Sequence, residues 1–296
     1  MKIMRRIGVL LCLCTVLLFT GCGAKNTLEG KLAVYTSVYP VYDFAVKIAG
    51  EHANVVSLVP AGVEAHDFEL GTKDMAMLSE ADVFIYCGAG MEHWVDKTLE
   101  TIQSDGLIAV EASKGVTLLS AEEQTDPHVW LAPKNAIVMM ENIKNALVEA
   151  DAAHKADYEA NFEKYKAQLE ALHKEYEDAL GAVAKKEIIV AHASFGYLCD
   201  AYGLHQTGIE GLMADSEPDP ATMKNIIDFI KQQGITTVFA GASESTKVVD
   251  TIADETGASL DVLDPIEGIS VERQEAGEDY FSIMKKNLEA LKKALQ

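Results

Sequence analysis

Short apolar runs alternate with helical stretches on both sides of one long segment that contains neither Gly nor Pro. Before that segment, strands are predicted at Leu32–Thr36, Val55–Val59, Val83–Cys87 and Leu107–Val110, and helices at Tyr42–Gly50, Lys73–Glu80 and Trp94–Gln103. After it, strands are predicted at Ile188–Ala191, Ile235–Phe239 and Ser259–Leu263, and helices at Phe195–Tyr202, Thr222–Gln233 and Thr246–Thr256. Such alternation is typical of parallel sheets covered by helices. The sequence therefore predicts an α/β fold with two lobes and mostly parallel sheets.

The segment between the two series, from His154 to Leu180, has apolar or aromatic residues in steps of three and four. These residues are Tyr158, Phe162, Tyr165, Leu169, Leu172, Tyr176 and Leu180. The spacing places them on one face of an α-helix about 40 Å long. A coiled-coil seam between two copies is the alternative, but the segment is shorter than four heptads. We expect one rigid helix packed along both lobes, and a monomer.

The N-terminus has the composition of a targeting segment. Three basic residues precede the apolar run Ile7–Phe19, which is too short to span a bilayer comfortably and is typical of a signal peptide. The stretch Leu-Phe-Thr-Gly-Cys that ends at Cys22 resembles a bacterial lipobox, although Phe19 stands where leucine is usual. Cys22 would then carry the lipid. The alternative is an ordinary signal peptide with an incidental cysteine.

Together these patterns divide the chain into successive parts. We expect a signal peptide at 1–21, a lipidated tether at 22–30, an N-terminal lobe at 31–150, a linking helix at 151–182 and a C-terminal lobe at 183–296. The division implies an extracytoplasmic protein that is attached to the bacterial cell membrane through its N-terminus.

Charge and cysteine content narrow the function. The chain has 46 acidic and 25 basic side chains and a net charge of −21, which disfavours nucleic acid and attracts cations. Beyond the tether only Cys87 and Cys199 remain, and neither belongs to a metal-binding spacing. We expect two separately buried thiols, since a disulfide would join the two halves.

Four side chains are candidates for a metal centre. His66, His192 and Asp264 come just after predicted strands, and His128 lies in a turn-like stretch before a helix predicted to begin near Pro133. Ligands of open parallel sheets bind beyond the carboxyl ends of the strands. Three imidazoles and one carboxylate suit four-coordinate zinc. Each half supplies two of the four, so a cleft between the lobes could collect them and couple metal binding to closure.

Longer stretches around these residues resemble motifs of one protein family, the zinc and manganese solute-binding lipoproteins of bacterial ABC transporters. The resemblance runs from about Lys31 to the C-terminus and rests on Val59–Glu69, Asp126–Leu131, Ala191–Tyr197 and Leu263–Pro265. It implies two α/β lobes bridged by a rigid helix, delivery of the metal to an ABC permease, and His66, His128, His192 and Asp264 as ligands.

The third ligand position bears on the choice of metal. Manganese-type members, as the resemblance implies, tend to have glutamate where this chain has His192. Because manganese favours oxygen ligands and imidazole suits zinc, we expect Zn²⁺ as the transported ion. A manganese receptor of the same type remains the alternative, and spacing alone does not exclude copper or nickel.

Two departures from the family pattern concern further ligands. The stretch Ala112–Asp126 contains no histidine, whereas many zinc-type members have a histidine-rich loop there. Gly241 stands where members often have glutamate, which would remove a carboxylate. Glu64, two residues before His66, is a possible outer-shell group, with a solvated loop residue as the alternative. His154 and His173, which lie among charged residues of the long helix, are expected to be solvated, and His52 is expected at the surface. His93 and His205 receive no functional assignment.

Other classes of function fit the sequence less well. A zinc hydrolase would need an open coordination position and a general base, and the chain has no HExxH, GxSxG or Gly-rich phosphate loop. An adhesin with purely structural histidines would need no metal at all. The sequence therefore predicts a non-catalytic metal receptor.

Overall fold

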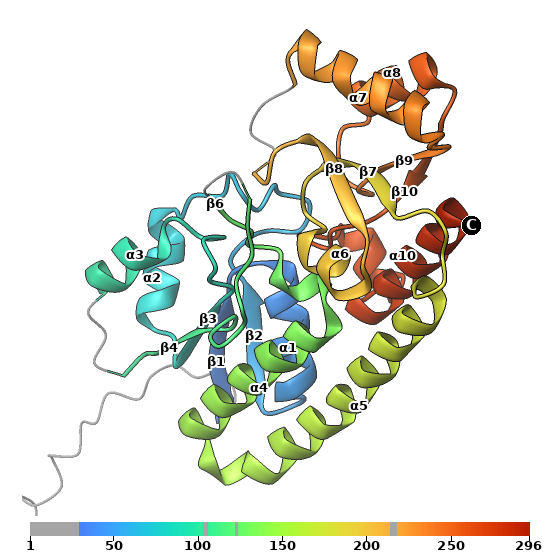
Figure 1. The fold of residues 1–296 in the computed structure, drawn as a ribbon. Helices are drawn as coiled ribbons and strands as arrows, with labels where there is room; N and C mark the ends of the chain where they lie inside the picture. Colours follow the sequence, from blue (N-terminus) through green and yellow to red (C-terminus); the bar gives the residue numbers. More distant parts are fainter. Residues whose placement is uncertain (1–29, 103–105, 122–123, 214–217) are drawn as a thin grey trace, which may run out of the picture. The chain divides into compact units, whose positions relative to one another are not determined.

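Two four-stranded parallel sheets form the framework of the computed structural model, which describes residues 30–102, 106–121, 124–213 and 218–296 (Figure 1). The predicted signal peptide and Cys22 lie outside these residues. Leu32–Gln296 forms one compact unit that contains both sheets. No described helix is both long enough and apolar enough to cross a membrane.

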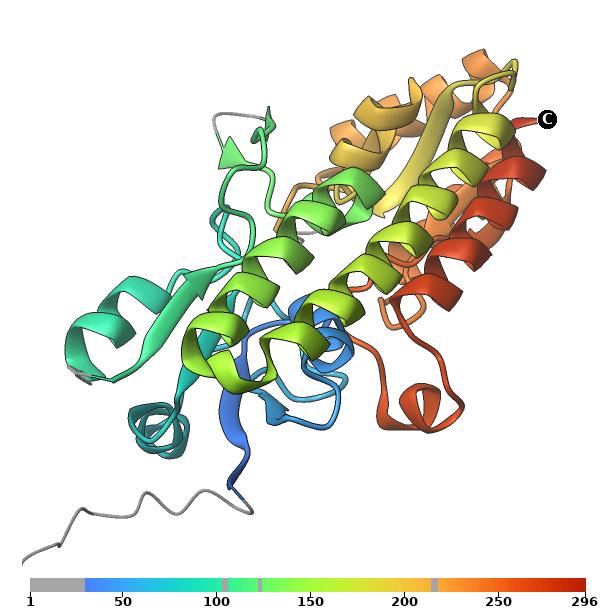
Figure 2. The ribbon, with the colours of Figure 1, turned by 90° about the horizontal axis from the view of Figure 1, so that it is seen from below.

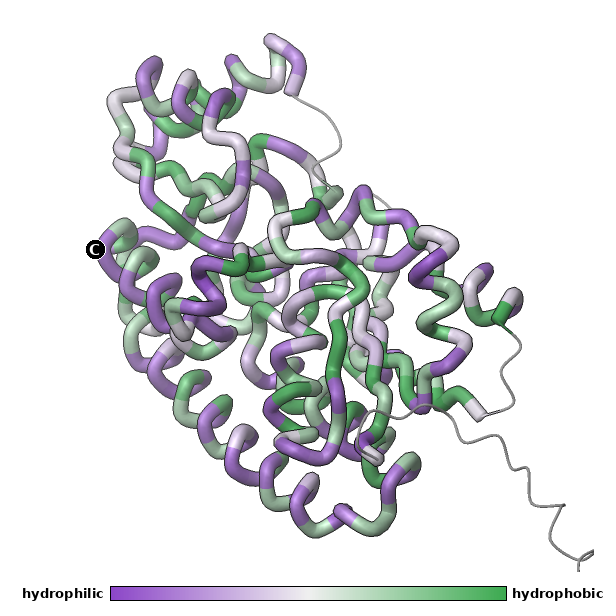
Figure 3. The backbone as a smooth tube through the Cα atoms, turned by 180° about the vertical axis from the view of Figure 1, so that it is seen from behind, coloured by the Kyte–Doolittle hydropathy of each residue, from purple (hydrophilic) through white to green (hydrophobic). Residues whose placement is uncertain are grey.

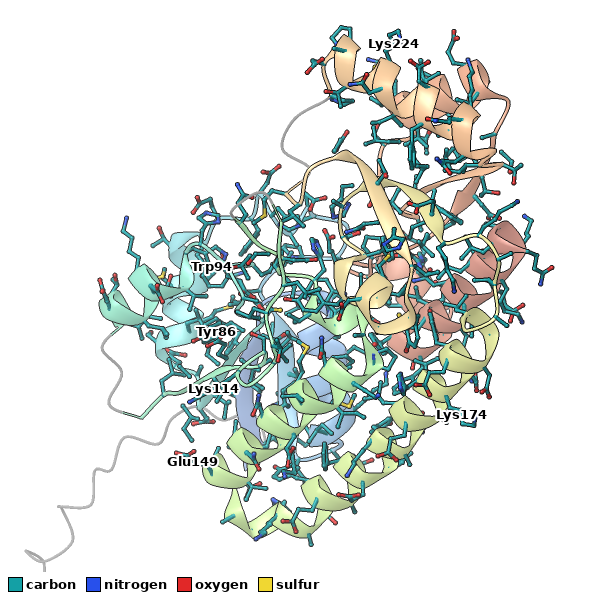
Figure 4. The ribbon with its side chains drawn as sticks, in the orientation of Figure 1. Tyr86, Trp94, Lys114, Glu149, Lys174 and Lys224 are labelled. Carbon is teal, nitrogen blue, oxygen red and sulfur yellow. The ribbon has the colours of Figure 1, made fainter. Side chains whose placement is uncertain are left out.

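The first sheet has the strand order β2-β1-β3-β4, with every neighbouring pair parallel. Its strands are β1 (Leu32–Thr36), β2 (Ala53–Ser57), β3 (Val83–Tyr86) and β4 (Ile108–Glu111). Its connections contain α1 (Tyr39–Ala49), α2 (Thr72–Ser79) and α3 (Val95–Ile102). Side chains alternate between the two faces, as the pleat requires. Val83 and Ile85 pack in the main core, whereas Phe84 packs in a separate cluster with Trp94. Trp94 lies beside α2 and α3 (Figure 4).

The second sheet repeats this architecture with the order β10-β9-β7-β8, again entirely parallel. Its strands are β7 (Glu187–His192), β8 (His205–Glu210), β9 (Thr237–Ala240) and β10 (Ser259–Val262). Its helices are α6 (Gly196–Tyr202), α7 (Pro220–Gln233), α8 (Lys247–Thr256), α9 (Val271–Glu275) and α10 (Tyr280–Leu295). β8 is not among the strands predicted from the sequence, because its polar segment His-Gln-Thr-Gly-Ile-Glu lacks an apolar run. It forms an edge strand of the sheet.

Local signals explain several helix ends. The Asp219 carboxylate accepts hydrogen bonds from the backbone N–H groups of Ala221 and Thr222 and so caps α7, as its position before Pro220 predicts. Gly234 ends that helix in the left-handed conformation that glycine adopts readily, with φ of 62°.

The predicted long helix is α5 (Lys155–Leu180), which follows a 3-10 turn at Ala152–His154. It packs against α1 and α4 (Pro133–Ala150) in the first half and against α6 and α10 in the second, as Figure 2 shows for α4 and α10. Six of the seven predicted stripe residues are buried; Tyr165 is partly exposed. Along α5 hydrophilic and hydrophobic segments alternate (Figure 3), and Lys174 points outward (Figure 4). The helix therefore connects the two lobes, as predicted.

Two further expectations have clear outcomes. Cys87 and Cys199 are both free and buried, which confirms the prediction of separate thiols. His173 is not solvated as predicted: its side chain is 13% exposed, and its Nδ1 lies 3.0 Å from the Tyr202 hydroxyl. Burial lowers the pKa of His173, because a charged ring loses its hydration there.

The packing of α5 generates a stability prediction. Leu169→Ala removes a fully buried side chain from the main core, so we expect the free energy of unfolding to fall by about 2–5 kcal/mol. Gln168→Ala, on the exposed face of the same helix, is the control and should change it by less than about 0.5 kcal/mol. Urea unfolding followed by circular dichroism measures both. Equal effects of the two substitutions would contradict the packing role of α5.

Candidate metal centre

Three histidines and one glutamate from the two halves of the chain converge on one point. His66 lies in the loop between β2 and α2, and His128 directly precedes the 3-10 turn Val129–Leu131. His192 is the last residue of β7, and Glu267 follows β10. One ligand atom from each of the four residues lies within 4.8 Å of the others. Among the described residues this is the one group of three or more His, Cys, Asp or Glu side chains so arranged.

The distances between the ligand atoms match those of a small coordination shell. His128 Nε2 lies 3.3 Å from His66 Nε2 and 3.3 Å from His192 Nε2. Glu267 Oε1 lies 3.0 Å from His192 Nε2 and 3.1 Å from His128 Nε2, and Oε2 lies 3.6 Å from His66 Nε2. With metal–ligand bonds of about 2.0–2.1 Å, two ligands of a tetrahedral zinc ion lie about 3.3 Å apart. The four residues fit such an ion.

Carboxylates behind two of the rings orient them. His128 Nδ1 lies 2.8 Å from Asp126 Oδ1, and His192 Nδ1 lies 3.1 Å from Glu244 Oε1. A carboxylate accepts, so a hydrogen is assigned to Nδ1 in each ring, and Nε2 is the atom that faces the centre and could bind an ion once it has lost its own proton. Nδ1 of His66 is buried without a hydrogen-bond partner among the described residues.

The contact between Glu244 and His192 explains why glycine stands at position 241, where family members often have glutamate. Glu244 Oε2 accepts a hydrogen bond from the Gly241 backbone N–H at 2.7 Å while Oε1 faces His192. A Cβ at position 241 would lie 2.6 Å from the Glu244 carboxyl carbon. Glycine at 241 therefore makes room for a carboxylate that arrives from position 244, so this region keeps a carboxylate beside the centre.

The ionisation of the metal-free centre follows from its burial and its hydrogen bonds. Burial disfavours the charged form of His192, but hydrogen bonds to Glu244 and Glu267 raise its pKa to about 10. Burial likewise opposes charge on His128, yet Asp126 and Glu267 raise its pKa above the usual range. Burial alone would raise the pKa of Glu267, whereas its hydrogen bonds to the three histidines hold it well below the usual range. Protons on the rings thus balance the Glu267 carboxylate.

The structure differs from the sequence prediction at the carboxylate ligand. Asp264 lies next to the centre but outside the converging group, because its carboxylate is engaged elsewhere. Oδ1 accepts from the Ile266 backbone N–H at 2.8 Å, and Oδ2 lies 2.7 Å from Arg273 Nη2. Glu267, three residues later, reaches the histidines instead. The sequence shows a second carboxylate with a longer side chain in the same loop, but nothing in its position marks it as the preferred ligand.

Glu64, the predicted outer-shell residue, lines a cavity beside Glu267. It is exposed, and its Oε1 lies 3.4 Å from the His66 backbone nitrogen. Desolvation and the nearby Glu267 raise the pKa of Glu64. Together with Glu244, Asp264 and Glu267 it lines a cavity of about 150 Å³. Carboxylates therefore line the space beside the ligands, which favours the approach of a cation.

Comparisons with known proteins point to zinc-uptake and zinc-binding proteins. The family model described as zinc-uptake complex component A, periplasmic (ZnuA) matches residues 34–294. The high-affinity zinc uptake system protein ZnuA of Bacillus subtilis is 37% identical over 92% of this chain and 90% of its own length. The zinc-binding lipoprotein AdcA of Streptococcus pneumoniae is 35% identical over 98% of this chain, which spans 61% of that longer protein.

Solved structures show the same fold. The Zn(II)-bound ZnuA-like domain of S. pneumoniae AdcA aligns with a TM-score of 0.82 and 37% identity over 90% of this chain and 99% of that domain. The laminin-binding protein Lmb of Streptococcus agalactiae, described as having adhesin and metal-transporting activity, aligns with a TM-score of 0.83 and 30% identity over 90% of this chain and all of its own. Since the family model covers most of the chain, this protein belongs to the ZnuA family of zinc-uptake components.

Proposed function

We propose that this protein is an extracytoplasmic receptor that captures one Zn²⁺ at His66, His128, His192 and Glu267. The observation that carries the proposal is the convergence of three Nε2 atoms and one carboxylate at separations suited to tetrahedral zinc. Three nitrogens and one oxygen suit zinc better than manganese, which prefers oxygen ligands. The zinc-binding names of the relatives support the same ion.

Capture draws ligands from both halves of the chain. His66 and His128 belong to the half with the first sheet, and His192 and Glu267 belong to the half with the second. Neither half alone offers more than two ligands, so the ion joins them and favours the closed arrangement. Because α5 packs on both halves, the accompanying movement is a small tilt or a local rearrangement of loops.

Delivery and attachment complete the proposed function. The matched family is a component of a zinc-uptake complex, which supports transfer of the ion to an ABC permease. Acylation of Cys22 would keep the receptor at the membrane; the lipoprotein name of AdcA supports it. The ion is cargo and the four residues complete its shell, so the centre needs no open position for substrate, and we propose no catalysis.

Removal of one ligand tests the site. The mature chain should bind one zinc ion, and His66→Ala should raise the dissociation constant by more than about 100-fold, since even outer-shell changes cost about 10–100-fold. His93→Ala is the control, because His93 is exposed and pairs with Glu69 outside the cluster. Competition with a zinc chelator measures the constants. No zinc binding by the parent chain, or an unchanged constant in His66→Ala, would refute the receptor.

Protonation of the centre predicts a pH dependence. His192, with its pKa raised to about 10, carries a proton at neutral pH that zinc must displace. Zinc binding at pH 7.5 should therefore release about one proton or more, and affinity should fall from pH 8 to pH 5. Calorimetry in two buffers of different ionisation enthalpy counts the protons. Equal heats in both buffers and a constant affinity across this range would contradict ligation by the histidines.

The shared shell predicts protection of its loops. Zinc should slow hydrogen exchange of backbone amides in residues 58–71 and 264–270, which carry His66 and Glu267, and leave amides of the α5 midsection unchanged. Mass spectrometry of peptides from metal-free and zinc-loaded protein measures the difference. Identical exchange in the two states would show that metal binding and closure are not coupled.

A further inference from the structure

The turn that carries Glu267 contains a residue in an unfavourable backbone conformation. Ile266 has a φ of 63° and is fully buried. The left-handed region is disfavoured for β-branched residues, so the surrounding structure must hold Ile266 there. The direction in which the next residue, Glu267, leaves the turn depends on this conformation.

Asp264 supplies the bond that stabilises the turn. Its Oδ1 accepts a hydrogen bond from the Ile266 backbone N–H at 2.8 Å. Its own backbone is fixed by the buried Asn287 of α10, whose side chain accepts from Asp264 N–H at 2.9 Å and donates to Asp264 O at 2.7 Å. Asp264 is thus a fixed support for the turn.

The other half of the chain holds the same turn from the opposite side. Trp130 Nε1 donates to the Pro265 carbonyl at 2.8 Å, and the Tyr39 backbone N–H donates to the Glu267 carbonyl at 3.3 Å. Trp130 lies two residues after the ligand His128. Every residue from Asp264 to Glu267 therefore has a hydrogen bond that fixes its position.

Arg273 of α9 binds one oxygen of the Asp264 carboxylate and so limits the other partners that this oxygen can contact. Its Nη2 lies 2.7 Å from Asp264 Oδ2, and its Nε donates to Glu278 Oε2 at 2.8 Å. Glu278 in turn pairs with Lys286 at 2.6 Å. Without Arg273, Asp264 would be a buried carboxylate without its ion-pair partner, and it lines the same cavity as Glu267, where a metal ion could attract it.

We propose that Arg273 and Asp264 are positioning residues that aim Glu267 at the ion and keep the Asp264 carboxylate out of the coordination shell. This inference rests on the proposed zinc site and deepens it. With Arg273 in place, the shell has three nitrogens and one oxygen, which favours zinc. With Arg273 removed, Asp264 adds oxygen ligands, the coordination number rises, and the preference moves toward metals such as manganese.

Cobalt and zinc binding to four variants test the proposal. Arg273→Met removes the cation, Asp264→Asn removes the charge but keeps an oxygen that can accept from Ile266, and the double variant removes both. Lys286→Met, at the outer end of the same network, is the matched control. The probes are Co²⁺, whose visible absorption is strong in four-coordinate and weak in higher-coordinate sites, and Zn²⁺ with Mn²⁺ as competitor.

Arg273→Met should lose most of the cobalt absorption, bind zinc about 10–100-fold more weakly and shift the competition toward manganese. The double variant should regain the four-coordinate spectrum, because the freed carboxylate is absent. Asp264→Asn should weaken zinc binding without changing the spectrum, because the amide loses the ion pair with Arg273 that holds this side chain against the Ile266 N–H. Lys286→Met should resemble the parent. If Arg273→Met does not fold, the zinc affinity of Asp264→Asn decides the positioning role.

The proposal would be overturned if Arg273→Met and Asp264→Asn kept the cobalt spectrum and the zinc affinity of the parent and only their melting temperature fell. The pair would then be a structural ion bridge. This failure is distinct from failure of the proposed function, in which the parent chain itself would not bind one zinc or cobalt ion.

Discussion

The close approach of three imidazole nitrogens to one buried carboxylate is the interaction on which the site depends. Nε2 atoms 3.3 Å apart tolerate each other only when a cation or protons lie between them. In the metal-free protein the Glu267 carboxylate and protons on the rings meet that requirement. Under the proposed function, zinc would take the place of these protons and keep the charge balance. The same arrangement that makes the site stable without metal therefore makes metal binding a competition with protons.

Buried hydrogen bonds behind the ligands maintain this arrangement. Asp126 and Glu244 orient two of the rings, and the turn Asp264–Glu267 is bonded at each residue. These supports come from both halves of the chain, and Tyr280 of α10 adds a further bond by donating to the Trp130 carbonyl at 2.7 Å. Because the ligands and their supports are shared between the halves, the position of one half relative to the other determines whether the shell is complete.

The framework positions the ligand residues and restricts how far the two halves could separate. The sheets place His192 at a strand end and His66 and Glu267 in loops beyond strand ends, as parallel sheets do for their ligands. Helix α5 packs on both halves along its length and limits their separation. In the proposed receptor, this packing favours local adjustment of loops over wide opening.

Much of this protein follows from local sequence signals. The strand and helix alternation, the stripe of α5 and the Asp219 cap all reflect periodicity and turn chemistry, which neighbouring residues determine. The same local patterns marked His66 and His192 after predicted strands and His128 in a turn-like stretch. The tertiary structure alone decided which carboxylate joins the histidines. Asp264 follows its strand directly, yet Arg273 and the Ile266 N–H occupy its oxygens, so the longer side chain of Glu267 reaches the centre. Such a choice depends on partners brought together by folding, and no spacing along the chain records it.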